Sequence, residues 1–320
     1  MAAAGRGAER EGRAVRGAAF EAGGASSAAP GARARRIVQA PPPEAYFVVS
    51  AVFHYLGPAF AVLLFARVDV LGVAWLRIAS AALIFAAWRR PWRRIRIASG
   101  RGAGVSRLLL AWGALLAVMN STFYLAIDRL PLGTVAAIEF LPVIVLAAIG
   151  ARTPRNLAAL ALAVPGVYLL TDVALEGNAL GVAFAFANAG LFAGYIVVSH
   201  RAAQHGSVPG IDLLGCAMLI AAVVATPVGA WAAAPAFLDP VALAAGIGVG
   251  VSSSVIPYVT DQLAMARMAR STYALMVALL PATATVIGIV VLAQLPSLLE
   301  ALGVALVICG VAVHRDADAG

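Results

Sequence analysis

The sequence is short of charge, and this shortage restricts what the protein can be. Charged residues fill only 12% of the 320 positions, whereas 62% are hydrophobic. A soluble domain of this size needs a larger polar fraction to cover its surface. The apolar residues also come in runs of about twenty, the length that crosses the hydrocarbon core of a bilayer. The composition therefore argues against a soluble helical bundle and for a membrane protein.

The sequence has no lysine at all, so arginine alone supplies the net charge of +8. A basic chain can be a nucleic-acid binder. Here nearly all the arginines lie in the first segment or in short connections between apolar runs, as expected of cytoplasmic loops. Nucleic acid is therefore not an expected partner.

Cysteine and catalytic motifs are also scarce. The two cysteines, Cys216 and Cys309, each lie in an apolar run, where a small buried thiol is the simplest interpretation. No metal-ligand spacing, phosphate-binding glycine loop, nucleophile elbow or catalytic carboxylate pair is visible. The run Ser252–Ser254 has no histidine partner and is expected to pack helices through small side chains. We expect no metal, no cofactor and no enzyme activity.

Apolar runs alternate with short polar connections after residue 44, and we expect an all-α integral membrane protein with ten transmembrane helices. The expected spans are 46–66, 70–88, 107–127, 132–150, 156–172, 179–199, 211–231, 241–261, 272–292 and 297–314. Residues 1–44, rich in Ala, Gly and Arg, are expected to form a disordered cytoplasmic tail. Residues 315–320 are expected to form a short cytoplasmic C-terminal tail.

The arginines also predict the orientation of the spans. They gather in the connections that follow spans two, four, six and eight, at Arg89, Arg90, Arg93, Arg94, Arg96, Arg101, Arg107, Arg152, Arg155, Arg201, Arg267 and Arg270, and again at Arg315. The other connections carry only Arg67 and Arg129. By the positive-inside rule, both termini of this multi-pass protein lie in the cytoplasm, and the membrane is the cell's inner (plasma) membrane.

Ten spans divide into two sets of five, which suggests an internal repeat. We expect one five-helix repeat at residues 45–175 and a second at 176–314, with Pro142 placed opposite Pro281. An odd number of spans in each half inverts the second copy. Inverted repeats place a substrate site near the midplane, between the halves. Pro142 and Pro281 are candidate hinges or helix breaks.

Two ionisable residues lie inside apolar runs, where an unpaired charge costs several kcal/mol. Arg77 in the second span and Glu139 in the fourth each lie about 10 Å from the outer face. Their equal depth and opposite charge predict an ion pair. In a functional pair, Glu139 would exchange a proton or meet a substrate ammonium, and Arg77 would tune the pKa of Glu139 or hold a carboxylate. In a structural pair, the two would only lock their helices together.

Other polar residues could line the same cavity. Asn120 and Tyr124 lie four apart on one face of the third span. The alternatives are an interhelical hydrogen bond for Asn120 and an aromatic-belt position for Tyr124. His54 in the first span is a candidate proton relay or substrate contact, or else a core histidine.

The second half places its polar groups toward the cytoplasm, as an inverted copy would. The candidate binding residues there are Tyr195, Tyr258 and Asp261, with Gln262 and Tyr273 nearby. Asp261 is close to a helix end, so a solvated interfacial charge is the alternative for it.

Several stretches resemble the drug/metabolite transporter superfamily, in its EamA-type branch, and within it the bacterial threonine/homoserine exporters. The stretches are Leu76-Arg77, Arg90-Pro91-Trp92-Arg93, Met119-Asn120-Ser121-Thr122-Phe123-Tyr124-Leu125-Ala126-Ile127, Leu130-Pro131-Leu132-Gly133-Thr134 leading to Glu139-Phe140, and Ile256-Pro257-Tyr258. The resemblance covers about residues 46–314 and matches Arg77, Asn120, Tyr124 and Glu139 one by one.

The resemblance implies secondary-active export of small amino acids or related metabolites by proton exchange and alternating access, without ATP. Two positions depart from the family pattern, because glutamates usual there are Leu280 and Gln294 in this chain. An importer or a carrier of sugars or nucleotide derivatives is the alternative within transport. A non-transporting membrane enzyme or scaffold is the alternative outside it. The expected partners are a small polar metabolite such as an amino acid, protons and membrane lipid, with a homodimer as an open alternative to a monomer.

Overall fold

The computed structural model describes residues 41–93, 104–150, 153–204, 210–265, 267, 276 and 279–313, and these residues form helices and connections without strands. The elements are α1 (Pro43–Leu64), α2 (Val70–Arg89), α4 (Gly104–Ile127), α5 (Leu132–Gly150), α6 (Pro154–Gln204), α7 (Gly210–Ala232), η1 (Ala234–Leu238), α8 (Pro240–Gly250), η2 (Val251–Val255), α9 (Ile256–Met265), α11 (Leu280–Leu292) and α12 (Leu298–Val313). Some expectations lie outside the described residues: residues 1–40 of the N-terminal tail, the C-terminal tail, Arg94, Arg96, Arg101, Arg152, Arg270, Tyr273, Arg315 and the first part of the ninth span.

Most of these helices have the length and composition of membrane spans. Six are long and apolar enough to cross a bilayer: Pro43–Leu64, Val70–Arg89, Arg107–Ile127, Asn178–Val198, Gly210–Ala232 and Pro240–Asp261. Four shorter apolar helices occupy Leu132–Pro142, Pro154–Leu170, Leu280–Leu292 and Leu298–Val313. The all-helical membrane architecture is confirmed, and the division into ten spans stays a prediction.

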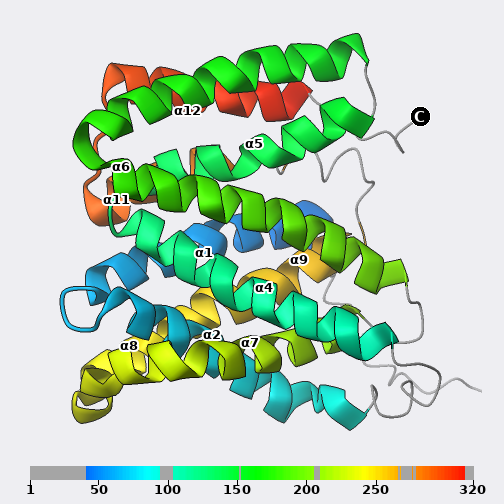
Figure 1. The fold of residues 1–320 in the computed structure, drawn as a ribbon, viewed down its shortest axis with the longest axis vertical. Coiled ribbons are helices and arrows are strands. Elements are labelled where there is room, and N and C mark those ends of the chain that lie inside the picture. Colours follow the sequence, from blue (N-terminus) through cyan, green and yellow to red (C-terminus); the bar gives the residue numbers. More distant parts are fainter. Residues whose placement is uncertain are drawn as a thin grey trace, which may run out of the picture. The chain divides into compact units, whose positions relative to one another are not determined.

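The long element α6 consists of two helical arms, as the sequence predicts for spans five and six. The break is at Asn178, whose backbone leaves the helix (φ −158°, ψ 79°). Its side-chain Oδ1 accepts a hydrogen bond from the N–H of Gly181 at 2.9 Å, so Asn178 caps the second arm. Figure 1 shows the second arm returning in the opposite direction.

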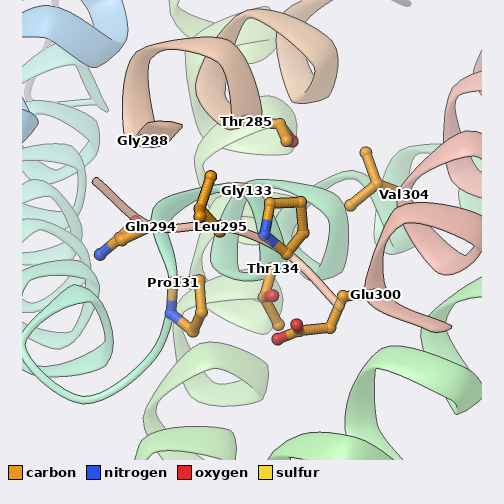
Figure 2. A pocket seen from close by; sticks show the side chains of 10 residues that line it. Pro131, Gly133, Thr134, Thr285, Gly288, Gln294, Leu295, Glu300 and Val304 are labelled. Carbon is orange, nitrogen blue, oxygen red and sulfur yellow. The ribbon is translucent and has the colours of Figure 1, made fainter. Parts of the chain in front are cut away.

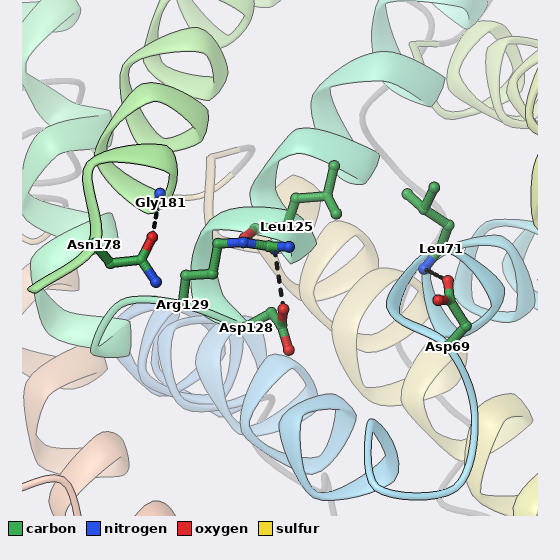
Figure 3. A network of polar contacts seen from close by, with 7 residues as sticks. All are labelled: Asp69, Leu71, Leu125, Asp128, Arg129, Asn178 and Gly181. Carbon is green, nitrogen blue, oxygen red and sulfur yellow. Dashed lines mark hydrogen bonds and ion pairs between the residues drawn. The ribbon is translucent and has the colours of Figure 1, made fainter.

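Short polar side chains start the helices that follow the connections. Asp69 caps α2 by accepting from the N–H of Leu71 at 2.9 Å, as drawn in Figure 3 beside the Asn178 cap. The same view shows Arg129, which donates to Asp128 at 3.0 Å and to the carbonyl of Leu125 at 2.8 Å (Figure 3). These contacts satisfy backbone groups at helix ends, where the helix itself offers no partner.

Helices from the two expected halves pack directly on one another. α1 contacts α8, η2, α9 and α11, and α2 contacts α7, α8 and η2 (Figure 1). Small residues permit this closeness. A Cβ on Gly57 would overlap Ser253, and a Cβ on Gly250 would overlap the hydroxyl of Ser80. Ser253 of η2 therefore lies in close contact with α1.

Polar contacts join connections that the arginine pattern assigns to the same side. At one end, Arg67 pairs with Asp239 at 3.2 Å, and Gln294 Oε1 accepts from the N–H of Leu132 at 3.0 Å. At the other end, Arg89 pairs with the buried Asp212 at 2.8 Å. The connections therefore alternate between two ends of the bundle. Below, the end that carries Arg67 is called the outer end.

Candidate functional site

Arg77 lies on α2 with only 6% of its surface exposed, and its guanidinium is held by the second half of the chain. Nε donates to Ser254 Oγ at 3.1 Å, and Nη2 donates to the carbonyl oxygen of Ser253 at 3.2 Å. The guanidinium also lies over the ring of Tyr124, 5.4 Å from its centroid. A desolvated cation on an aromatic face gains about 2 kcal/mol. The charge of Arg77 is thus stabilised without a carboxylate.

Local sequence explains why the carbonyl of Ser253 is free to accept from Arg77. Pro257 lies four residues later and has no N–H to donate back to it. In addition, residues Val251–Val255 form a π-helical turn rather than an α-helical one. Such turns displace backbone groups from their usual partners and occur often at functional sites.

Glu139 lies on α5, is 9% exposed, and is also held by the second half. Its Oε1 accepts a hydrogen bond from Nδ2 of Asn188 at 3.1 Å. Asn188 is completely buried on the second arm of α6, and its own Oδ1 has no partner. Pro142, inside α5, leaves the carbonyl of Ile138 without its helical donor beside Glu139.

The direct ion pair predicted between Arg77 and Glu139 is not formed in this structure. Both side chains are described, and their hydrogen bonds go to Ser253, Ser254 and Asn188 instead. The two charges still interact electrostatically at longer range. The prediction failed because two residues at the same depth in the membrane can point toward different neighbouring helices.

Tyr55, Tyr124 and Tyr258 lie near the two charges, and Tyr195 extends the cluster toward Asp261. Tyr55 on α1 and Tyr258 on α9 both lie within electrostatic range of Glu139. Tyr258 also interacts with Arg77, and Tyr195 interacts with Tyr258 and Asp261. Tyr195 stacks on Phe192 with ring centroids 6.0 Å apart. The structure thus brings Arg77, Glu139, Tyr124, Tyr195, Tyr258 and Asp261 into one polar region.

The remaining predicted residues are placed less directly. His54 is half-buried on α1 and interacts electrostatically with Arg77. Asn120, 4% exposed on α4, donates to the carbonyl of Leu116 at 2.7 Å, one turn back in its own helix. Its amide is therefore used within the helix rather than across it. Pro281 lies at the start of α11, so the described part of that helix begins there.

Sequence reasoning missed three residues of this site. The sequence pattern predicts only a packing role for Ser253 and Ser254 and does not point to Asn188. For Ser253 and Asn188, the sequence does contain a signal. Ser253 lies four residues before a proline, and Asn188 is an amide inside the apolar run 179–199, where an unpaired amide costs several kcal/mol.

Several buried polar atoms around the two charges have no hydrogen-bond partner. They are the hydroxyls of Tyr55, Tyr124 and Ser253 and the Oδ1 of Asn188. The Tyr124 hydroxyl lies near Ser253 and Arg77 without good hydrogen-bond geometry to either. Unpaired groups of this kind favour a polar ligand. A buried cation and a buried carboxylate that do not pair with each other suit a ligand that carries both charges.

A separate hollow of about 140 Å³ lies at the outer end, between α5, α11 and α12 (Figure 2). Gln294, Thr134 and Glu300 line it, and none of the predicted site residues does. Glu300 is already used there, because its carboxylate accepts from the N–H of Ser297 at 2.8 Å in a reciprocal helix cap. The hollow is therefore distinct from the polar cluster around Arg77.

The family match and the similar curated proteins both point to membrane transporters. Residues 179–314 match the model of the EamA-like transporter family. The chain is 34% identical over 243 residues to the threonine/homoserine exporter RhtA of Salmonella typhimurium strain LT2 and 33% identical to that of Escherichia coli strain K12. Each alignment covers 74% of this chain and 79% of the exporter. A solved crystal structure shares the fold, with a TM-score of 0.52 and 19% identity over 84% of this chain and 96% of its own.

Proposed function

This chain belongs to the EamA-like transporter family, and we propose that it exports a small amino acid, similar to threonine or homoserine, in exchange for protons. Family membership makes it a membrane transporter and not an enzyme. The observation that carries the proposed substrate is the pair of buried opposite charges, Arg77 and Glu139, each hydrogen-bonded to the other half of the chain. The names of the relatives support the same class of substrate.

Arg77 is the proposed partner of the substrate carboxylate. A guanidinium offers a planar fork of donors that fits a carboxylate with two parallel hydrogen bonds. In the structure, Ser254 Oγ and the Ser253 carbonyl occupy two of those donors. A substrate carboxylate forms stronger, charge-assisted bonds at the same donors, so it can displace the serines.

Glu139 is the proposed partner of the substrate ammonium and, alternately, of a proton. A carboxylate in the membrane interior is costly unless its charge is neutralised. Either a proton or an ammonium neutralises it, and the carboxylate cannot hold both well at once. Release of the amino acid on one side and of the proton on the other would then couple the two movements.

Alternating access is the proposed way in which the site opens to each side. The contacts of Arg77 and Glu139 both join the first expected repeat, 45–175, to the second, 176–314. They must therefore break and form again as one half moves against the other. Pro142 in α5 and Pro257 beside η2 remove helical hydrogen bonds close to these contacts, which supports bending at those points.

The proposed arrangement is ten transmembrane helices in two inverted five-helix repeats, in the inner membrane, with both termini cytoplasmic. The break at Asn178 lies close to the proposed boundary between the repeats. The polar contacts at each end of the bundle join connections that the positive-inside rule places together, which supports the alternation.

A second candidate is a carrier of another metabolite class within the same fold. The observation that favours it is the apolar Leu280 at a position where the exporters usually carry a glutamate. The other departure from the family pattern, Gln294, is weaker evidence for another substrate. Its side-chain oxygen, which a glutamate would also have, accepts a hydrogen bond from the backbone N–H of Leu132.

Counterflow in proteoliposomes tests the proposal. Vesicles containing the purified chain are loaded with an unlabelled compound, and uptake of the labelled compound is measured for amino acids, sugars and nucleotide derivatives. We expect uptake of threonine-like amino acids. Uptake confined to sugars or nucleotide derivatives would contradict the substrate class and leave the transporter fold intact.

A further inference from the structure

A second potential binding site lies on the outside of the bundle, in a groove between α1 and α8. The groove holds about 480 Å³. Phe60 and Leu63 on α1 and Val241, Ala245 and Gly248 on α8 line it. These residues recur three or four positions apart, so the groove runs along the two helices rather than across them.

The groove is apolar and open to its surroundings. The exposed fractions are 44% for Phe60, 56% for Leu63 and 66% for Val241. α1 and the segment Pro240–Asp261 both have the length and composition of membrane spans, so lipid surrounds this face. From Val241 to Ser252 the groove runs for about 16 Å, which is about half of the ~30 Å hydrocarbon core. It therefore has the length of one leaflet.

An ion pair lies at the outer end of the groove. Arg67 lines the groove and meets Asp239 through one contact of 3.2 Å, and both side chains are partly exposed. Asp239 also accepts from the N–H groups of Val241 and Ala242 at 2.9 and 3.2 Å. The Ala242 N–H is the largest of the effects that lower the pKa of Asp239, so its carboxylate is ionised at neutral pH. The rim thus offers a cation with free donors beside an anion with free acceptor sites.

We propose that this groove binds phosphatidylethanolamine from the outer leaflet. One acyl chain lies along Phe60, Leu63 and Gly248, the phosphate meets Arg67, and the ammonium meets Asp239. Charge decides the choice of lipid. Phosphatidylglycerol has the phosphate but no ammonium, so its phosphate would draw Arg67 from Asp239 and offer Asp239 no cation in return.

The deep end of the groove connects the bound lipid to the transport site. Ser252 lines the groove, and its neighbours Ser253 and Ser254 hold Arg77. An acyl chain in the groove would pack on the same π-helical turn. The proposed lipid site rests on the proposed orientation of the spans, which places Arg67 at the outer face, and it does not depend on the identity of the substrate.

Native mass spectrometry of the full chain in detergent tests this inference. The protein is mixed with equal amounts of phosphatidylethanolamine and phosphatidylglycerol, and the bound lipids are counted. We expect the wild type to retain more phosphatidylethanolamine, by roughly two- to fivefold, as one partly exposed ion pair allows. Equal retention of the two lipids would overturn the proposal.

Two sets of variants locate the bound lipid. Gly248→Leu fills the groove, and a Cβ at that position meets no atom within 4 Å, so the helices need not move. Gly190→Leu is the matched control, because it makes the same change at an exposed α6 glycine with equally open surroundings. We expect the preference to be lost in Gly248→Leu and kept in Gly190→Leu. An unchanged preference in Gly248→Leu would contradict the groove as the site.

The double variant Arg67→Gln/Asp239→Asn tests the headgroup contact without filling the groove. Asparagine is also a good helix N-cap, so α8 keeps its start. We expect this variant to bind both lipids equally. If this variant still prefers phosphatidylethanolamine, then Arg67 and Asp239 do not recognise the headgroup.

Discussion

Replacing Arg77 by Gln removes the charge that is proposed to bind the substrate carboxylate and keeps most of the side-chain volume. In the wild type, the guanidinium makes hydrogen bonds of 3.1 and 3.2 Å to Ser254 and Ser253 and covers the ring of Tyr124. A glutamine can donate to one serine at a time and carries no charge. Packing around α2 should therefore survive, while recognition of an anion should not.

The size of the effect follows from the bonds that the substrate would form. A hydrogen bond to a charged group contributes about 1.5–3 kcal/mol, and a carboxylate would take two from Arg77. Part of that gain offsets the loss of the serine contacts. A net loss of about 3 kcal/mol corresponds to a drop of about 100-fold in kcat/KM for an amino acid.

The assay compares initial uptake of threonine with that of threonine amide, which lacks the carboxylate. The wild type should prefer threonine, and Arg77→Gln should transport both poorly and without preference. Arg129→Gln is the control, because its ion pair with Asp128 at 3.0 Å is at the outer end of the bundle, away from the polar cluster. A wild-type preference for the free acid in Arg77→Gln would refute the assignment of Arg77 to the carboxylate.

Combining Arg77→Ala with Glu139→Ala separates the binding role from a structural lock. A structural ion pair would predict that the double variant recovers what each single variant loses. Because the two side chains have separate partners in the structure, we expect no recovery of transport.

Three further predictions concern stability, pH and movement. Asp212→Ala removes the partner of Arg89, 2.8 Å away, and should lower the free energy of unfolding by about 3 kcal/mol in chemical denaturation, since the charge of Arg89 is left unpaired. The pKa of Asp239 is held below its ordinary 3.8, so its stabilisation is complete above that value and is lost as the pH falls through the lower folded pKa. We therefore expect the melting temperature of Asp239→Ala to fall less than that of the wild type as the pH is lowered through the acid range. Pro257→Ala gives the Ser253 carbonyl a helical N–H, so we expect slower counterflow at an unchanged or higher melting temperature.

The sequence predicted the all-helical membrane architecture because apolar run length depends directly on the thickness of the bilayer. The ranges expected for the fifth and sixth spans, 156–172 and 179–199, meet at the observed break at Asn178. The family resemblance is confirmed by the relatives and by the family match. The ten-span count and the inverted repeat stay predictions, since the described helices include four short ones.

The site was predicted only in part. A charged residue in an apolar run is easy to recognise in the sequence, but the sequence does not show which residue it contacts. Arg77 and Glu139 are buried in one polar region, as expected for residues that are expensive in the membrane interior. Their partners depend on helix rotation and on the π-helical turn Val251–Val255, which no local sequence period reveals. The partner of Asn120 was likewise not predictable from the sequence, because its amide donates to the carbonyl of Leu116 in its own helix.

The most direct test of proton exchange measures threonine movement driven by a pH gradient in proteoliposomes, for the wild type, Glu139→Gln and Glu300→Gln. Glutamine at 139 keeps an oxygen for the Asn188 contact, seen at 3.1 Å, but cannot take up a proton. Glu300→Gln makes the same change in the helix cap at the outer end. We predict that the gradient drives threonine in the wild type and in Glu300→Gln and has no effect in Glu139→Gln. Gradient-driven transport by Glu139→Gln at the wild-type rate would contradict the proton role of Glu139.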